Sequence, residues 1–406
     1  MNTLVVAPFS PYPLIFGGAI RLYHVVKMFS LLSDVTLLAY RSYSGPEGPI
    51  GDLDTICKEV IIVDRPPSHT RKKAALQVKS LFSTRSFQYY STYSPHFQHE
   101  LDALLARRHF ECIVTDFSQM GYFRYRHDRA LRILDLHNIE HELLYRRAQV
   151  EQNPIKKAAL ALEAWKFRRD EIAIAMQHDL VLTASERERD QLREQVTTVA
   201  VEALPNSIDA DYFALRPSTP STNEITFVGT THVDANRDGL CYFMDEIFPL
   251  LEQRVPDIHF TIVGGEPPAS IRAFGRRHNV EVTGGVPDVR PYMARAKVLV
   301  VPLRVGGGTR LKVLEGLAYG VPTVSTRLGS EGINVEDGRH ILLADEPGEF
   351  CEKVVRALRD TELQALLINN GRQLVERQYS WQAVGKHLAR YLDAAFLRRQ
   401  GLRAAA

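Results

Sequence analysis

One segment, residues 305–332, constrains the fold of this chain more than any other; its sequence is VGGGTRLKVLEGLAYGVPTVSTRLGSEG. Three consecutive glycines follow an apolar run over 298–303, and leucines then recur with the spacing of a half-buried helix. Gly320 and Pro322 are a helix stop, and residues 323–326 have the pattern of the next buried strand. The segment therefore predicts a strand, a glycine loop, a helix and a second strand, as in a parallel α/β sheet.

The glycine loop of this segment suits an anion, because backbone N–H groups approach a ligand closely at glycine and a helix N-terminus adds unpaired donors. Arg310 and Lys312 place two cations in the first turn, where they oppose the helix dipole unless an anion lies between them. Lys312, Glu315 and Tyr319 share one stripe of the helix. A diphosphate with a sugar hydroxyl nearby would satisfy these groups. The alternative is an ordinary turn with Lys312 and Glu315 as a weak surface pair.

The length and composition describe an ordinary globular protein. A chain of 406 residues should hold two or more domains, and the net charge of +2 argues against a dedicated nucleic-acid binder. The four cysteines lie far apart and form no metal-ligand or redox spacing, which favours buried thiols in a reducing compartment. The chain shows no signal-peptide pattern and no apolar run of membrane-spanning length. We expect a cytoplasmic protein.

The first half of the chain alternates strands with helices. Short apolar strands are expected at 4–7, 35–39, 59–63, 112–116, 131–136, 180–183 and 199–203. Gly17 and Gly18 stand at the mouth of the first helix, but the complete GxGxxG fingerprint is absent. A plain strand-to-helix turn is the alternative interpretation. Residues 140–178 predict a long, highly charged helical region.

One of these strands, at 131–136, ends in a polar sequence, Asp135-Leu136-His137-Asn138. Ligands of parallel α/β sheets bind at the strand ends, so His137 could position a sugar hydroxyl or a phosphate, or act as a base. It could equally be a structural histidine that caps the next helix.

The second half restarts the alternation after a Pro-, Ser- and Thr-rich linker at 216–223. Strands are expected at 224–228, 259–263, 280–283, 298–302 and 341–343, with glycines after several of them, and an amphipathic helix at 379–397. The predicted fold class is α/β, with two doubly wound parallel sheets and a cleft between them.

A basic run extends over Arg65–Arg85 and contains no acidic residue. Such a run is usually a solvated face. The alternative is docking on anionic lipid head groups or on an anionic acceptor.

In this order, the motifs resemble those of the GT-B glycosyltransferases, specifically the retaining family 4 (glycosyl transferases group 1). The resemblance covers nearly the whole length. The motifs that carry it are PFSPYPLIFGGAIR, LDLHNIEHELLYRR, LTASERERDQLRE, LPNSIDADYF, FVGTTHVDANRDGL, HFTIVGGEPP and VTGGVPDVRPYMARAKVLVVPLRVGGGTRLKVLEGLAYGVPTVST. It implies three parts: an acceptor-binding domain over 1–204, a nucleotide-sugar-binding domain over 205–378, and a last helix over 379–406 that crosses back onto the N-terminal domain.

The resemblance also assigns roles to single residues. Gly17 and Gly18 would approach the donor diphosphate, and His137 would contact the transferred sugar. Glu315 would be the second acid of the family's E-x7-E motif and bind the ribose hydroxyls. The backbone at Gly285 and Val286 would hold the nucleobase.

Two departures from the family pattern matter. Gly307 stands where the first acid of E-x7-E is expected, and Thr230 stands at one position of a basic pair, with Arg237 the only cation near the other. We expect Arg310 and Lys312 to supply the missing positive charge. The predicted catalytic residues are therefore His137, Arg310 and Lys312. The predicted donor-binding residues are Gly17, Gly18, Arg237, Gly285, Val286, Gly306, Gly307, Gly308, Thr309 and Glu315.

The resemblance implies transfer of a sugar, with retention, from a nucleotide diphosphate sugar to an acceptor hydroxyl. We expect a UDP-sugar as donor, and a carbohydrate, lipid-linked or small-molecule acceptor, in the biosynthesis of cell-surface polysaccharide or glycoconjugate. No metal or other cofactor is expected, because protein cations can neutralise the leaving diphosphate. Two alternatives remain open: a nucleotide-sugar epimerase of the same fold, and a degenerate transferase that only binds a nucleotide sugar.

Overall fold

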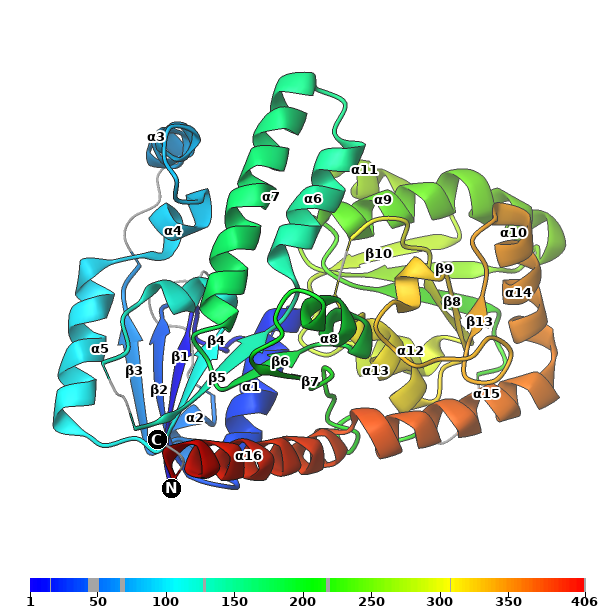
Figure 1. Ribbon diagram of the computed structural model, residues 1–406. Coiled ribbons are helices and arrows are strands. Elements are labelled where there is room, and N and C mark those ends of the chain that lie inside the picture. Colours follow the sequence, from blue (N-terminus) through cyan, green and yellow to red (C-terminus); the bar gives the residue numbers. More distant parts are fainter. Residues whose placement is uncertain are drawn as a thin grey trace. The chain divides into compact units, whose positions relative to one another are not determined.

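The computed structural model describes residues 1–14, 16–42, 51–65, 70–126, 129–216, 220–306 and 308–404. The chain forms two compact units. The N-terminal unit comprises Met1–Pro205 and Gly385–Ala406, and the C-terminal unit comprises Asn206–Val384. Each unit has its own parallel sheet with helices around it (Figure 1).

The sheet of the N-terminal unit has seven strands in the order β3-β2-β1-β4-β5-β6-β7. They are β1 (Asn2–Ala7), β2 (Asp34–Tyr40), β3 (Glu59–Val63), β4 (Cys112–Asp116), β5 (Leu131–Leu136), β6 (Leu180–Thr183) and β7 (Ala200–Ala203). All neighbours pair in parallel, with Val5 of β1 opposite Leu37 on one side and Val114 on the other. The central strands are near-continuous runs of Val, Ile and Leu because both of their faces are buried.

Helices of the N-terminal unit are α1 (Gly17–Ser30), α2 (Leu53–Ile56), α3 (Thr70–Leu81), α4 (Phe87–Thr92), α5 (Pro95–Arg107), the 3-10 turn η1 (Ser118–Tyr122), α6 (Glu140–Val150), α7 (Pro154–Ala175) and α8 (Glu186–Arg193). The helical region expected over 140–178 is confirmed, and it consists of two helices, α6 and α7. The Asn153 side chain accepts hydrogen bonds from the N–H groups of Ile155 and Lys156, and Pro154 takes the first helical position. This cap starts a new helix, and α6 and α7 lie side by side as a hairpin (Figure 1).

The sheet of the C-terminal unit has six strands in the order β10-β9-β8-β11-β12-β13. They are β8 (Glu224–Val228), β9 (His259–Val263), β10 (Val280–Gly284), β11 (Val298–Val301), β12 (Thr323–Ser325) and β13 (Leu342–Leu343). Its helices are α9 (Asp234–Tyr242), the π-helical turn η2 (Phe243–Ile247), α10 (Phe248–Arg254), α11 (Ala269–Phe274), α12 (Arg290–Arg295), α13 (Leu311–Tyr319), the 3-10 turn η3 (Leu328–Ser330), α14 (Pro347–Arg359), α15 (Thr361–Leu374) and the π-helical turn η4 (Val375–Tyr379).

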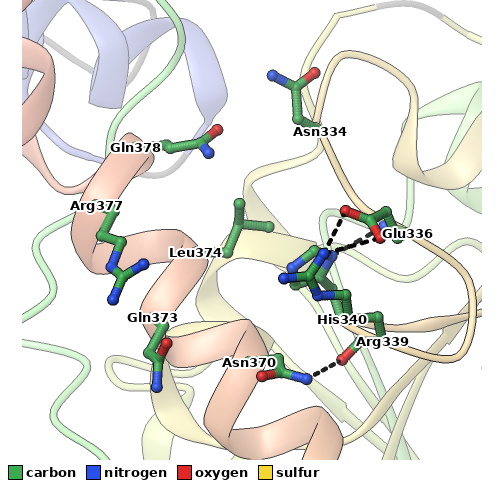
Figure 2. Close-up of a pocket in the computed structure, with 9 residues that line it drawn as sticks. All are labelled: Asn334, Glu336, Arg339, His340, Asn370, Gln373, Leu374, Arg377 and Gln378. Carbon is green, nitrogen blue, oxygen red and sulfur yellow. Dashed lines mark hydrogen bonds and ion pairs between the residues drawn. The ribbon is translucent and has the colours of Figure 1, made fainter.

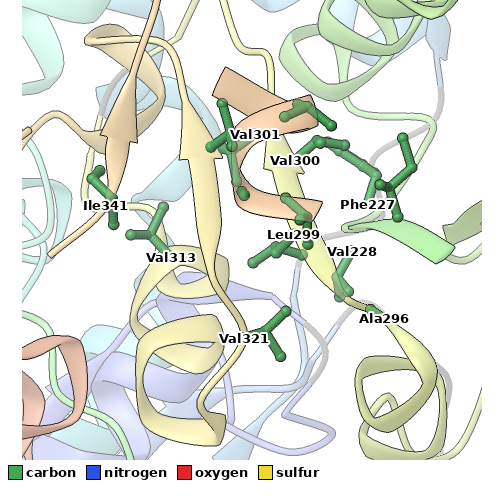
Figure 3. Packing of buried hydrophobic residues seen from close by; sticks show 14 of the residues in the cluster. Phe227, Val228, Ala296, Leu299, Val300, Val301, Val313, Val321 and Ile341 are labelled. Carbon is green, nitrogen blue, oxygen red and sulfur yellow. The ribbon is translucent and has the colours of Figure 1, made fainter. Parts of the chain in front are cut away.

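The segment β11-loop-α13-β12 is the strand, loop, helix and strand that the sequence predicts. Val313 of α13 and Val321, which follows the helix, pack with Leu299 of β11 and Phe227 of β8 in the buried core (Figure 3). Gly320 ends α13 in the left-handed conformation, at a φ of 78°.

The last helix, α16 (Trp381–Ala404), belongs to the N-terminal unit from Gly385 onward. There the Tyr391 hydroxyl donates to the carbonyl oxygen of Ala203, and Arg399 pairs with Asp179. Among the helices that the structure describes, none combines the length and the apolar character needed to cross a bilayer.

Candidate functional site

Polar residues and glycines gather at the carboxyl ends of the strands where the strand order of each sheet reverses. This point lies between β1 and β4 in the N-terminal unit and between β8 and β11 in the C-terminal unit. Because helices leave in opposite directions there, the strand ends border a crevice in which doubly wound sheets bind their ligands. Each unit therefore carries one candidate half-site.

Lys312 lies on α13, which follows β11, and its side chain contacts residues on and after β8, the other strand at the switch point of the C-terminal unit. Its Nζ donates to Oδ1 of Asn236 on α9 at 2.9 Å and lies 4.0 Å from the ring centroid of Phe227 on β8. Nδ2 of Asn236 in turn donates to the carbonyl oxygen of Thr230. A Cβ atom at Gly229 would lie 2.5 Å from Nζ, so the lysine can reach this position only over a residue without a side chain.

The electrostatics of this half-site favour a negatively charged ligand. Burial, together with the nearby Arg310 guanidinium, lowers the pKa of Lys312 to about 7. Burial also raises the pKa of Glu315 to about 7, although Lys312 opposes that shift. Its direct partners, Asn236 and the Phe227 ring, are uncharged, and the charge of Glu315 offsets the burial of the ammonium group only in part, so an anion would add charge compensation. Paired shifts of this kind are typical of functional sites.

Arg310 lies over the glycine loop. Its Nη2 is 3.0 Å from the position of a Cβ atom at Gly306. Gly306 and Gly308 have φ values of 111° and 75°, in the region that favours glycine, and Thr309 is half-buried beside them. Gly307 lies outside the described residues, so its predicted role stays a prediction.

Three neighbouring strands, β8, β9 and β10, all run into glycines at this edge of the sheet. A Cβ atom at Gly264 would lie 1.9 Å from the carbonyl oxygen of Gly229, and one at Gly285 would lie 3.6 Å from Cα of Gly265. Backbone therefore lies directly against backbone, which leaves a surface without side chains. Val286 follows, half-buried against the core.

Arg237, the remaining predicted donor-binding residue, lies on α9 next to Asn236. Its guanidinium is 2.7 Å from the carboxylate of Asp234, on the same helix and three residues earlier. The structure thus places Arg237 in a local ion pair, and its contact with a donor stays a prediction.

A buried chain of charged side chains forms the half-site of the N-terminal unit. Arg21 of α1 donates from Nε and Nη2 to the two oxygens of Asp135, at 3.1 and 2.5 Å, and from Nη1 to the carbonyl oxygen of Leu204. His137 Nε2 lies 2.8 Å from Oδ1 of Asp116 and 3.5 Å from Oδ2 of Asp135. Asp116 ends β4 and Asp135 lies near the end of β5, so the parallel sheet brings the two carboxylates together.

The neighbouring carboxylates favour the protonated form of His137. Burial alone would lower the pKa of His137, but the charges and hydrogen bonds of Asp116 and Asp135 outweigh it and raise the value. Burial raises the pKa of Asp116. Although burial would also raise the pKa of Asp135, the Arg21 guanidinium and His137 hold it well below its usual range. In its protonated form His137 would donate from Nε2 to Asp116.

The other ring nitrogen of His137 is available to a ligand. Nδ1 is buried and has no hydrogen-bond partner among the residues that the structure describes. A Cβ atom at Gly18 would lie 3.5 Å from it and would press on the rings of Phe16 and Phe9, at 3.1 and 3.2 Å. The structure therefore brings the predicted residue Gly18, together with its neighbour Gly17, to the predicted His137.

Asp116, Asp135 and His137 could also be considered as metal ligands, because one ligand atom from each lies within 4.8 Å of the others. However, Arg21 already occupies both oxygens of Asp135, and His137 Nε2 is bonded to Asp116. A cation would have to displace a buried guanidinium. We assign the cluster as an ion-pair network.

Sequence reasoning missed several residues of these half-sites. Asp116 was recognisable in principle, since it ends an apolar strand, whereas Asp135 was seen in the motif Asp135-Leu136-His137-Asn138 but was given no role. Asn236 carried no signal, because its partner Lys312 is 76 residues away. Glu140, in the first turn of α6, was also missed; burial and the charge of Glu171 raise its pKa to about 7.

A separate hollow of about 300 Å³ lies in the C-terminal unit between the loop 334–340 and the helical segment 370–378 (Figure 2). Arg339 is 3.0 and 3.1 Å from the two oxygens of Glu336, and Asn370 Nδ2 donates to the carbonyl oxygen of Arg339. Arg377 also lines the hollow, but Arg339 is neutralised locally, and the loop 334–340 leads into the amino end of β13 rather than leaving the carboxyl end of a strand, so we do not place the anionic ligand here.

Comparisons with known proteins agree with this architecture. Residues 222–360 match the model of the family described as glycosyl transferases group 1. The chain is also similar to an uncharacterized 44.6 kDa protein in the cps region of Klebsiella pneumoniae, at 22% identity over 397 residues, which cover 94% of this chain and 97% of the other.

Two solved structures share the fold along essentially the whole chain. Sucrose-phosphate synthase from Thermosynechococcus elongatus has a TM-score of 0.71 at 18% identity and covers 100% of both chains. Anabaena Alr3699/HepE, in complex with UDP and glucose, has a TM-score of 0.65 at 12% identity over 96% of this chain and 99% of that one. The predicted fold, GT-B with two Rossmann-like parallel sheets, is confirmed.

Proposed function

We propose that this protein transfers a sugar from a nucleotide diphosphate sugar to an acceptor hydroxyl, because residues 222–360 match the model of glycosyl transferases group 1. The observation that carries the proposal is Lys312, a half-buried cation with uncharged partners at the switch point of the sheet. A diphosphate is the ligand whose charge suits this position.

The donor would lie along the glycine-lined strand ends. Its diphosphate would be held by Lys312, Arg310 and the loop amides, and Glu315 would accept hydrogen bonds from the ribose hydroxyls. The flat backbone surface at Gly265 and Gly285 suits the base. We favour UDP, supported by the neighbour of like fold that is complexed with UDP and glucose.

In the N-terminal unit, the Nδ1–H group of protonated His137 would donate a hydrogen bond to the transferred sugar. The amides at Gly17 and Gly18 would add donors near the diphosphate. As the bond between the sugar and the diphosphate breaks, negative charge grows on the phosphate oxygens, where fixed positive groups accelerate the step most. The leaving phosphate would accept the proton of the acceptor hydroxyl, which is consistent with retention without a covalent intermediate.

Further parts of the proposal rest on the family resemblance. We propose a hexosyl donor, metal-independent transfer, an N-terminal unit that binds the acceptor, and a cytoplasmic role in polysaccharide or glycoconjugate synthesis. The relative in a cps region supports the last of these. Activity that persists with EDTA would be expected for a metal-independent enzyme.

The first test is thermal unfolding with UDP, GDP, dTDP and ADP. A nucleotide at about a hundredfold over its dissociation constant stabilises the protein by roughly 2.7 kcal/mol. We expect one nucleotide to act, and Lys312→Ala to abolish the effect. Lys297→Ala is the matched control. Lys297 is a lysine at the amino end of β11, whereas Lys312 follows the carboxyl end of the same strand, where the donor site is proposed. No shift with any nucleotide would overturn the donor site.

Turnover separates the two rivals from the transferase. A labelled UDP-sugar that changes configuration without any acceptor would identify the epimerase. Binding without any turnover, in the presence of a panel of acceptors, would identify the degenerate binding protein.

A further inference from the structure

Large apolar side chains lie exposed along one face of α7. Ile155 is 80% exposed, Trp165 60% and Leu162 37%. Together with Ala158, these residues recur at intervals of three or four, so they form one stripe of the helix. A soluble helix normally turns such a stripe toward its core, but here Ala164 and Phe167 are the buried side.

The end of α3 adds more exposed apolar side chains next to α7. Phe82, just after the helix, is 90% exposed, and Val78 and Leu81 are exposed as well. We call this set, Val78, Leu81, Phe82, Ile155, Leu162 and Trp165, the α3–α7 face.

Polar bonds hold the two parts of the α3–α7 face together. Ser80, the buried residue at the end of α3, donates to the carboxylate of Glu163 at 2.8 Å, and Lys166 donates to the carbonyl oxygen of Ser80. The second oxygen of Glu163 accepts from the N–H group of Phe87, at 2.7 Å. The end of α3 is therefore fixed beside the middle of α7.

The charges around the α3–α7 face are positive. Over 75–85 and 154–169 the sequence has one acid, Glu163, which is half-buried and held by the bonds above. The exposed cations are Lys79, Arg85, Lys156, Lys157, Arg168 and Arg169. Lys79 and Arg85 also lie over the rings of Tyr90 and Tyr89, at 4.5 and 5.0 Å.

We propose that the α3–α7 face docks on an anionic lipid bilayer, with Phe82 and Trp165 in the interface and the cations on the head groups. Exposed aromatic and aliphatic side chains with Lys and Arg on the same helices are the pattern of interfacial binding. A symmetric contact with a second copy is disfavoured, because it would set cations against cations. This inference does not rest on the transferase proposal, since bilayer binding is measured without turnover.

The test is cosedimentation with vesicles of phosphatidylcholine, alone or mixed with phosphatidylglycerol. We expect binding to the anionic vesicles and roughly tenfold or more weakening by Lys156→Glu/Lys157→Glu, since each basic residue near the surface contributes about 1 kcal/mol. Phe82→Glu/Trp165→Glu should abolish binding. Leu31→Glu is the matched control, because Leu31 is a 69% exposed apolar residue of the same unit, at the end of α1.

A second readout locates the contact. The chain has two tryptophans, so Trp381→Phe leaves Trp165 as the single tryptophan, which can be excited selectively at about 295 nm. Its emission should shift to the blue on anionic vesicles and be quenched by brominated lipid.

Several outcomes would overturn the proposal. These are a wild-type chain that ignores anionic vesicles, vesicle binding with unchanged Trp165 emission, or equal loss in Leu31→Glu. A dimer in light scattering that Phe82→Glu/Trp165→Glu converts to a monomer, without vesicle binding, would assign the face to a second copy instead.

Discussion

Nε2 of His137 lies 2.8 Å from Oδ1 of Asp116, and both side chains are buried. Asp116→Asn keeps an acceptor at this position but removes its charge, so the pKa of His137 should fall. Because protonated His137 is proposed to contact the sugar, the alkaline limb of the pH–rate profile should move to lower pH and kcat should decrease. The measurements are that profile and an NMR titration of the imidazole.

The pH dependence of the free energy of unfolding provides a second measurement on the His137–Asp116 pair. A histidine with a raised folded pKa contributes stability that is complete below its unfolded pKa, about 6.5, and is lost as pH rises through the folded value. In Asp116→Asn, the free energy of unfolding should therefore no longer fall as pH rises through this range. Asp190→Asn, at an exposed residue paired with Arg189, is the control. An unchanged imidazole titration in Asp116→Asn would contradict the assignment.

Arg21 is paired with the buried carboxylate of Asp135, so replacing Arg21 should lower the free energy of unfolding. Arg21→Met leaves Asp135 without its guanidinium, and we expect a loss of about 3–5 kcal/mol in the free energy of unfolding. Asp135 has a lowered folded pKa, so its contribution is present above about pH 4 and is lost as pH falls through the folded value. The loss in Arg21→Met should therefore shrink in acid.

Urea unfolding at several pH values measures this effect. Arg21→Met/Asp135→Asn should recover part of the stability, because the neutral amide needs no counter-charge. Equal losses in the single and the double variant would show that Arg21 acts through packing rather than through Asp135.

The sequence allowed the fold to be predicted because its signals are local. Each buried strand is a short Val, Ile or Leu run closed by glycine or a polar residue, and β11, α13 and β12 follow that pattern closely. The helical region at 140–178 was predicted as well, but its division into two helices at Asn153-Pro154, a capping sequence that starts a new helix, was not.

The half-sites were only partly predictable, because their chemistry depends on pairs distant in sequence. Lys312 was identified from its position after a glycine loop, but Asn236, which holds it, comes from another helix. His137 was identified at a strand end, whereas its partner Asp116 lies 21 residues earlier, on the adjacent strand. Only the strand order shows that these residues meet.

Nucleotide binding should change the protonation of the donor half-site. At about pH 8 most free Lys312 is neutral and Glu315 is ionised, so a bound diphosphate that charges Lys312 takes up close to one proton. At about pH 6 Lys312 is already charged, and a Glu315 that binds ribose as a carboxylate releases a proton instead. These expectations follow from pKa values of about 7 for both groups.

Calorimetry of UDP binding in buffers of different ionisation enthalpy measures the proton transfer. The sign should reverse between the two pH values, and Lys312→Met should lose the uptake at the higher one. Uptake that persists in Lys312→Met would assign it to another group.

When no ligand is bound, Lys312 should lower the free energy of unfolding of the protein. Its pKa of about 7 lies below the unfolded value, so the cost is complete below about pH 7 and fades toward about pH 10. Lys312→Met should raise the free energy of unfolding by about 1–2 kcal/mol near neutral pH, a range that allows for partial solvent exposure. The gain should be smaller at alkaline pH. Lys297→Met serves as the control, and a net loss of stability would contradict the prediction.

Gly264 provides a test of the backbone surface at the ends of β8 and β9. A Cβ atom there would lie 1.9 Å from the carbonyl oxygen of Gly229, which itself borders Lys312, so Gly264→Ala must displace backbone. We expect a loss of about 3 kcal/mol or more in the free energy of unfolding, together with weaker nucleotide binding.

Gly348→Ala is the matched control, because Gly348 lies in the first turn of α14 with no heavy atom within 4 Å of its Cβ position. Urea unfolding should leave that control unchanged or slightly stabilised. If Gly264→Ala and Gly348→Ala were equally stable, the ends of β8 and β9 would be able to separate. The proposal of a rigid backbone surface for the nucleobase would then be wrong.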